Sequence, residues 1–139
     1  MPESTELAAR LRNFEVAARM QSAVPEVADL SGENAETRAL YGLDNPATAE
    51  YGARCLLARR LVEKGVRFVQ LVHNGQPWDT HSKNADSLKS LCAMSDQPSA
   101  ALVTDLKRRG LLDSTIVIWT GEFGRLPVSQ GTEIGRAHV

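Results

Sequence analysis

The stretch TIVIWTGEFGR, residues 115–125, joins an apolar, β-branched run to a glycine-rich polar turn. Its first half predicts a strand that is covered on both faces, as in a central parallel sheet. A second such run, VRFVQLV at residues 66–72, leads into the polar stretch 73–81. Because helical patterns lie between the two runs, the order predicts a βαβ unit with an extended crossover. The expected fold class is therefore α/β.

The helices around these strands are predicted from the spacing of apolar side chains and from capping residues. A proline ends a helix in this scheme, because the residue before it is pushed out of the α region. The predicted helices cover about residues 4–23 before Pro25, a short segment reaching Leu40 before Gly42, a segment from the N-cap Asn45 to Lys64 and Gly65, residues 84–91, and residues 96–109 from the N-cap Asp96 to Gly110.

The overall composition narrows the class of protein. The chain has 139 residues, of which 42% are hydrophobic and 24% charged, which is typical of one globular domain. A net charge of −1 argues against a nucleic-acid partner, and no apolar run is long enough for a membrane span. The polar, acidic start is not a secretory signal. Cys55 and Cys92 fit small buried hydrophobes better than disulfide partners.

The tetrapeptide WDTH, residues 78–81, follows the first predicted strand. Ligands of open α/β sheets bind just beyond the carboxyl ends of the strands. Asp79 and His81 offer a carboxylate and an imidazole, which are good ligands for zinc or manganese. The alternative makes Asp79 a turn or capping residue and His81 a surface residue. The strand end before the tetrapeptide favours the metal-site interpretation.

The pentapeptide GEFGR, residues 121–125, follows the second predicted strand in the same way. Its glycines allow the backbone a close approach to a ligand. Glu122 is a candidate metal ligand or general base, and Arg125 is a candidate for gripping a phosphate or sulfate group. A Glu–Arg ion pair that braces a loop is the structural alternative. An acidic residue directly after a buried strand is costly without a partner, which favours a functional role.

Other charged or titratable positions carry weaker signals. His73 could be a third ligand, but a loop histidine bonded to backbone is the simpler interpretation. The pair Arg59–Arg60 and the run 107–109 are interpreted as solvated helix faces. The last seven residues, 133–139, resemble the translation of a sequencing adapter. The expected organisation is therefore a partial domain over residues 1–132 and a non-native tail over 133–139.

These motifs, in this order, resemble the domain-of-unknown-function 1501 family of bacterial proteins, best known in planctomycete-type genomes. The most specific matching segments are CLLARRLVEKGVRFVQ at 55–70, WDTH at 78–81, LKRRGLLD at 106–113 and GEFGR at 121–125. The family looks like a branch of the alkaline phosphatase and sulfatase superfamily. The resemblance implies a fragment of a parallel-sheet α/β/α sandwich, an incomplete chain, and an exported or periplasmic protein.

The resemblance also implies a function. It predicts a metal-dependent hydrolase of phosphate or sulfate esters, acting on a small molecule or a polysaccharide. Asp79, His81 and Glu122 would hold a divalent metal ion (zinc, calcium, magnesium or manganese), and the catalytic residue Arg125 would hold the anionic substrate. The fragment alone is expected to be inactive. A non-catalytic, exported binding or scaffold relative is the alternative, and a small complete regulatory domain is the third.

Overall fold

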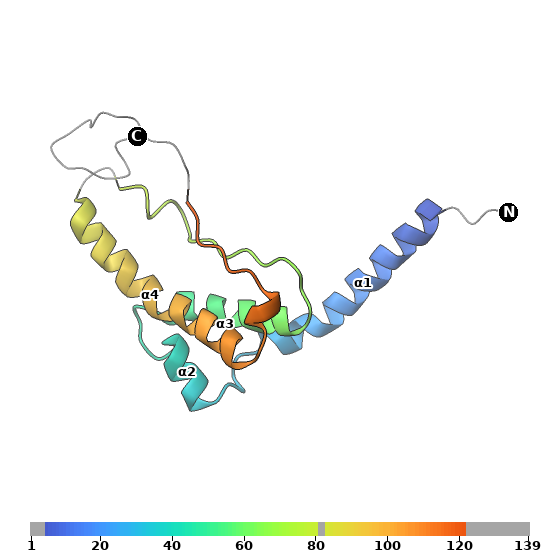
Figure 1. Ribbon diagram of the computed structural model, residues 1–139, viewed down its shortest axis with the longest axis horizontal. Coiled ribbons are helices and arrows are strands. Elements are labelled where there is room, and N and C mark those ends of the chain that lie inside the picture. The colour runs from blue at the N-terminus through green and yellow to red at the C-terminus, as the bar shows by residue number, and fades with distance from the viewer. Residues whose placement is uncertain (1–4, 81–82, 122–139) are drawn as a thin grey trace. The chain divides into compact units, whose positions relative to one another are not determined.

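The computed structural model describes residues 5–80 and 83–121 (Figure 1). The chain divides into two compact units, residues 1–32 and residues 33–139. The first unit contains helix α1, Thr5–Ala28. The expected end before Pro25 is wrong, because α1 continues through this proline. The carbonyl of Pro25 still accepts a bond from the amide of Asp29 at 3.1 Å, so the proline removes one donor without ending the helix.

Helix α2, Ala35–Tyr41, lies where the sequence predicts a short helix and ends one residue beyond the predicted end at Leu40. The side chain of Asn34 accepts a hydrogen bond from the Thr37 amide at 2.8 Å, which caps the first turn. Gly42 ends the helix with φ +66°, in the left-handed region that glycine adopts without steric cost. Gln97 of a later helix donates to the carbonyls of Ala39 and Leu40, which satisfies the free end of α2.

Helix α3, Ala49–Glu63, begins later than the sequence predicts. Asn45 was the expected N-cap, but its side chain accepts a bond from the Ala47 amide within a turn that precedes the helix. The Thr48 hydroxyl closes this turn by donating to the Gly42 carbonyl at 2.7 Å. The other end of the helix is as expected, with Lys64 at the C-cap and Gly65 at φ +82°.

Helix α4, Asn84–Arg108, replaces the two helices expected in this region. Asp96, the expected N-cap, lies inside it, and so does the buried Pro98. Gly110 follows the helix at φ +68°, and the short 3-10 helix η1, Leu112–Ser114, comes next. The prediction was wrong because an aspartate is common at helix starts, and here packing of the helix outweighs this local signal.

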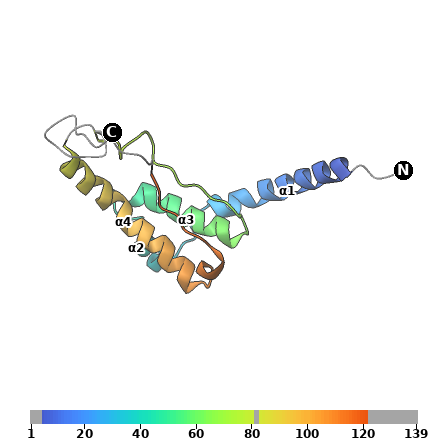
Figure 2. The same ribbon diagram turned by 45° about the horizontal axis from the view of Figure 1, so that its top comes forward.

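The core of the second unit lies where α2, α3 and α4 pack on one another (Figure 2). Gly52 lets α3 approach the end of α2, because a Cβ at this position would lie 2.2 Å from the Tyr41 carbonyl oxygen. Cys55 is a free, buried thiol and Cys92 is a free, half-buried one. The largest fully buried side chains of this core are Tyr41, Leu56, Leu106, Thr48 and Pro98.

A buried ion cluster joins the same three helices. The guanidinium of Arg59, whose side chain is 4% exposed, contacts Glu63 at 2.5 Å and Glu33 at 3.3 Å. Its Nε lies 3.1 Å from Asp105, a charge contact without hydrogen-bond geometry. Asp105 also accepts bonds from Tyr41 at 3.1 Å and from Arg109 at 2.8 Å. The prediction that Arg59 belongs to a solvated helix face is therefore wrong.

The parallel-sheet α/β/α sandwich is also a wrong prediction. The described residues form helices α1 to α4 and η1, and none of them forms a strand. Segments 66–72 and 115–120, the two expected strands, are extended, but no backbone hydrogen bond joins them. A β-rich run becomes a strand only when a neighbouring strand pairs with it. The apolar side chains of the second run are accordingly exposed, with Ile116 at 87% and Ile118 at 76%.

Candidate functional site

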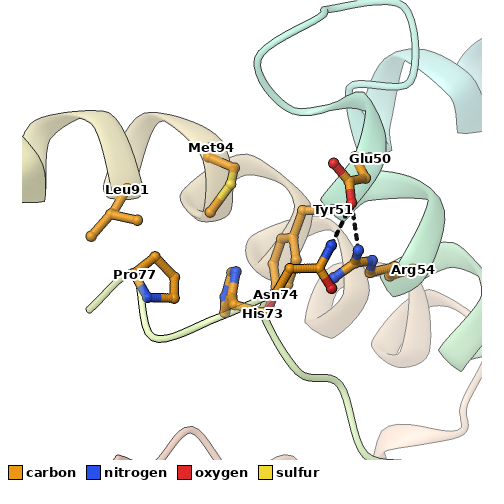
Figure 3. Close-up of a pocket in the computed structure, with 8 residues that line it drawn as sticks. All are labelled: Glu50, Tyr51, Arg54, His73, Asn74, Pro77, Leu91 and Met94. Atoms are coloured by element: carbon orange, nitrogen blue, oxygen red, sulfur yellow. Dashed lines mark hydrogen bonds and ion pairs between the residues drawn. The ribbon is translucent and has the colours of Figure 1, made fainter. Parts of the chain in front are cut away.

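A pocket of about 160 Å³ lies between helices α3 and α4 and the loop that follows the first extended segment (Figure 3). Helix α4 supplies apolar side chains, α3 supplies a charged pair and an aromatic ring, and the loop supplies polar groups and a proline. The lining residues are Glu50, Tyr51, Arg54, His73, Asn74, Pro77, Leu91 and Met94. Concave sites of this mixed character, apolar with a few polar groups, are where small ligands bind.

A row of four rings runs from the pocket to the two motif segments. The imidazole of His73 stacks on Tyr51 of α3, with centroids 4.5 Å apart and planes at 15°. Trp78 meets His73 edge to face at 5.8 Å, and Trp119 meets Trp78 in the same way at 6.1 Å. Edge-to-face and stacked pairs of this spacing are the favoured aromatic geometries. The row connects the helical core to both segments that the sequence singled out.

The charged groups of the pocket are paired with one another. Arg54 forms an ion pair with Glu50 one helical turn earlier and donates to the Val72 carbonyl at 2.8 Å. The amide of Asn74 reaches the same Glu50 carboxylate at 3.5 Å. Burial, and then the charge of Arg54, lower the pKa of His73 from its ordinary value. His73 is therefore neutral at neutral pH, and its ring packs as an uncharged aromatic.

Asp79 is the one predicted site residue that lies within the described part of the chain. It is exposed, and its amide donates to the Gln76 carbonyl at 3.1 Å in a tight turn. The next residue, Thr80, is buried, and its hydroxyl donates to Asn84 in the first turn of α4 at 2.5 Å. Asp79 is thus held on a loop that is fixed on both sides, by Trp78 and by Thr80. His81, Glu122 and Arg125 lie outside the described residues.

The contact of Trp78 with Trp119 brings the two motif segments together. Trp78 is the residue before Asp79, and Trp119 is followed by Thr120 and Gly121, the last described residue. Within the described ranges, no group of three or more His, Cys, Asp or Glu side chains surrounds a common point. The metal site that the sequence predicts is therefore represented here by Asp79 alone.

Sequence reasoning missed the pocket residues of α3. The stacking of Tyr51 on a loop histidine could not be foreseen from the pattern of one helix. Glu50 and Arg54 do carry a signal, because an acidic and a basic residue four positions apart share one helix face. His73 was expected to be a backbone-bonded loop residue or a third ligand, whereas the structure places its ring between two aromatic side chains.

The described part of the molecule is thus a helical protein with a pocket that contains aromatic rings, beside a loop that exposes Asp79. A family model for "Protein of unknown function (DUF1501)" matches residues 1–139, and the chain belongs to this family. No match was found among curated proteins or among solved structures. None of the helices within the described residues is long and apolar enough to cross a membrane.

Proposed function

We propose that this chain supplies part of the active site of a metal-dependent hydrolase that acts on phosphate or sulfate esters. The single observation that supports the proposal is the contact of Trp78 with Trp119, because it brings the segments that carry the two motifs side by side. Motif order supports a relation of the family to alkaline phosphatases and sulfatases, and it suggests a small-molecule or polysaccharide ester as the substrate. An exported location is part of the same proposal.

The proposed ligands are Asp79, His81 and Glu122. Two carboxylates and one imidazole suit a divalent ion such as zinc, manganese, magnesium or calcium. The fit is supported at Asp79, which is exposed on a loop fixed by its neighbours and so can accept an ion without disturbing the core. When bound, a divalent ion supplies a Lewis acid that stabilises negative charge on an ester oxygen.

The proposed role of Arg125 is to bind the anionic part of the substrate. A guanidinium presents a planar fork of donors that matches two oxygens of a phosphate or sulfate group. Asp79 would orient the ion, and Arg125 would orient the ester beside it. Such fixed charges lower the barrier most when they face the position where charge develops in the transition state.

Metal binding by the purified chain tests the proposal. We expect isothermal titration to detect a divalent ion, and Asp79→Ala and His81→Ala each to weaken binding. The loss should exceed the roughly 10- to 100-fold that removal of an outer hydrogen-bond partner costs. Asp96→Ala is the matched control, because Asp96 is an exposed aspartate on α4, away from both motifs. Its affinity should equal that of the unsubstituted chain.

A non-catalytic binding or scaffold protein is the second candidate. It is favoured by the pocket, where Arg54 and Asn74 are already bonded to Glu50 and the walls are apolar. Paired polar groups of this kind orient a ligand without reacting with it. Equal metal affinity of the Asp79→Ala, His81→Ala and unsubstituted chains would favour this candidate over the hydrolase.

A further inference from the structure

His73 occupies the middle of the contacts that connect helix α3 to the WDTH segment. Its ring stacks on Tyr51 and meets Trp78 edge to face. Figure 3 shows the imidazole between Pro77 on one side and Tyr51 on the other. Trp78 in turn contacts Trp119, so the packing of α3 reaches both motif segments through this ring.

Other contacts hold the loop before and after Trp78. Arg54 holds the carbonyl of Val72, and Asn74 is bonded to Glu50, both before the turn at Gly75. After the motif aspartate, Thr80 is bonded to Asn84 of α4. Between these anchors, the ring of Trp78 contacts His73 on the side of α3 and Trp119 of the second extended segment.

The groups that face His73 favour its uncharged form. Arg54 of α3 places a positive charge nearby, and Glu50, which offsets that charge, is already paired with Arg54 and Asn74. Burial raises the pKa of Tyr51, so its phenol remains protonated and neutral. From α4 the pocket receives Leu91 and Met94, which carry no charge. A proton on the imidazole would therefore meet a guanidinium at a half-buried position.

One interaction favours the protonated form of His73 instead. A cation above an aromatic face is stabilised by about 0.5–1 kcal/mol at exposed sites, so Tyr51 would attract a protonated imidazole. The pKa of His73 is nevertheless lowered, first by burial and then by Arg54. Burial and the nearby guanidinium therefore both act against this attraction.

We infer that the neutral ring of His73 is the positioning residue for the segment Trp78–Thr80, and that protonation of this ring releases Trp78 from α3. The segment carries the exposed Asp79. The inference rests on the proposed function only in one respect, namely that release of Trp78 also displaces a metal ligand.

The direction of the pH dependence follows from linkage. A histidine that is free in solution titrates near its ordinary pKa of 6.5, and His73 in the packed loop titrates below it. The packed state therefore binds fewer protons than the released state. Its stability is complete above about pH 6.5 and is lost as the pH falls from there through the lowered pKa.

Trp78 fluorescence tests the inference in metal-free buffer. The chain has two tryptophans, so the emission of a Trp119→Phe variant comes from Trp78 alone. We expect the emission to shift to the red as the pH is lowered from about 8 to about 5, because the indole leaves a half-buried site for water. The helical circular dichroism signal should stay constant over the same range.

Substitutions in the Trp119→Phe background assign the shift to one residue. His73→Phe keeps an aromatic ring that cannot be protonated, so Trp78 should remain packed and its emission should not change with pH. His73→Ala should give the red-shifted emission at every pH. His138→Asn is the matched control, since it removes another histidine, to which no role is assigned, and should leave the pH-dependent shift intact.

Any of three results would overturn the inference. The first is constant emission of the Trp119→Phe chain across the pH range, the second is the same shift in His73→Phe, and the third is a change in intensity alone. A fall in intensity without a shift in wavelength means quenching by a ring that stays in place, and it also contradicts release. If the shift is found and the chain binds no metal ion, the positioning role of His73 stands and the hydrolase proposal fails.

Discussion

Arg59 illustrates how much depends on a single side chain in this fold. Its guanidinium is almost fully buried and contacts carboxylates from the segment before α2, from α3 and from α4. A buried charge is stable only when its partners are present, because each ion has given up its hydration. The hydroxyl of Tyr41 also donates to Asp105, and burial, followed by this carboxylate, raises the pKa of the phenol. The cluster thus couples three helices.

Removal of the Arg59 guanidinium should destabilise the protein strongly. We expect Arg59→Ala to lower the free energy of unfolding by about 3–5 kcal/mol, because Glu63 and Asp105 then lose a buried counter-charge. Urea denaturation followed by circular dichroism measures the change. Arg108→Ala is the control, since the Arg108–Glu36 pair is exposed, and its effect should stay within about 0.5 kcal/mol. Equal effects of the two substitutions would show that the buried cluster does not stabilise the fold.

The role of Arg59 could not be predicted from its local sequence. Two adjacent arginines within a helix usually face water, and although Glu63 lies four positions after Arg59 on the same helix face, that pairing does not indicate burial. The other partners lie far away, since Glu33 is 26 positions from Arg59, and Asp105 is 64 positions from Tyr41. A pattern within one helix carries no information about a contact that forms only when helices pack. The Glu50–Arg54 pair, by contrast, is four positions apart and could have been found.

At the scale of elements, the approach of α3 to α2 depends on Gly52. A methyl group here would overlap the Tyr41 carbonyl, which is backbone and cannot move aside freely. Gly52→Ala should therefore destabilise the protein by about 1–3 kcal/mol, although alanine favours a helix interior by about 1 kcal/mol over glycine. The measurement is the midpoint of thermal unfolding.

The same substitution at Gly32 provides the control. A Cβ at Gly32 would have open space around it, so Gly32→Ala should be neutral or stabilise by at most about 1 kcal/mol. A Gly52→Ala protein as stable as the Gly32→Ala protein would mean that α3 does not pack closely on α2.

Helices were more predictable than strands because their signals are local. The cap Asn34 and the stop Gly42 act within a few residues of the helix that they bound, and the predicted end of α2 is wrong by only one residue. Asp96 gave a local signal too, but it was overridden inside α4 by packing. A strand is different, because its backbone hydrogen bonds go to another segment of the chain. Among the described residues, the run 115–120 has no backbone hydrogen bond to another extended segment.

At the scale of the whole molecule, the extended segments leave apolar side chains in water. Phe68 is 81% exposed, Ile116 is 87% exposed, and Trp119 is 61% exposed. Extended apolar segments with unpaired backbone groups associate with one another. We expect the purified chain to self-associate with increasing concentration, as measured by light scattering, and Ile118→Lys to reduce the effect.

A second lysine variant separates charge from hydrophobicity. Ser114→Lys adds the same charge at an exposed position next to the same segment and removes no apolar group. Its self-association should remain close to that of the unsubstituted chain. If both lysine variants reduce association equally, net charge is the cause, and the exposed apolar segment is not.

The candidate site was partly predictable at this scale. The sequence placed WDTH and GEFGR at the ends of two β-rich runs, and the Trp78–Trp119 contact does bring those runs together. The link to α3 through Tyr51 and His73 was not predictable, because it depends on how a loop folds back on a helix. Asp79 remains a predicted ligand, with its exposed position on a fixed loop in support.

The two thiols differ in burial, so their labelling rates can report how fast the core opens. Burial raises the pKa of Cys55 to about 11, so this sulfur is almost entirely the unreactive thiol at neutral pH. Cys92 is only half-buried on α4. An alkylating reagent will therefore modify Cys92 in the native protein and reach Cys55 only when α3 separates from its neighbours. The rate at which the second label appears is then the rate at which the core opens.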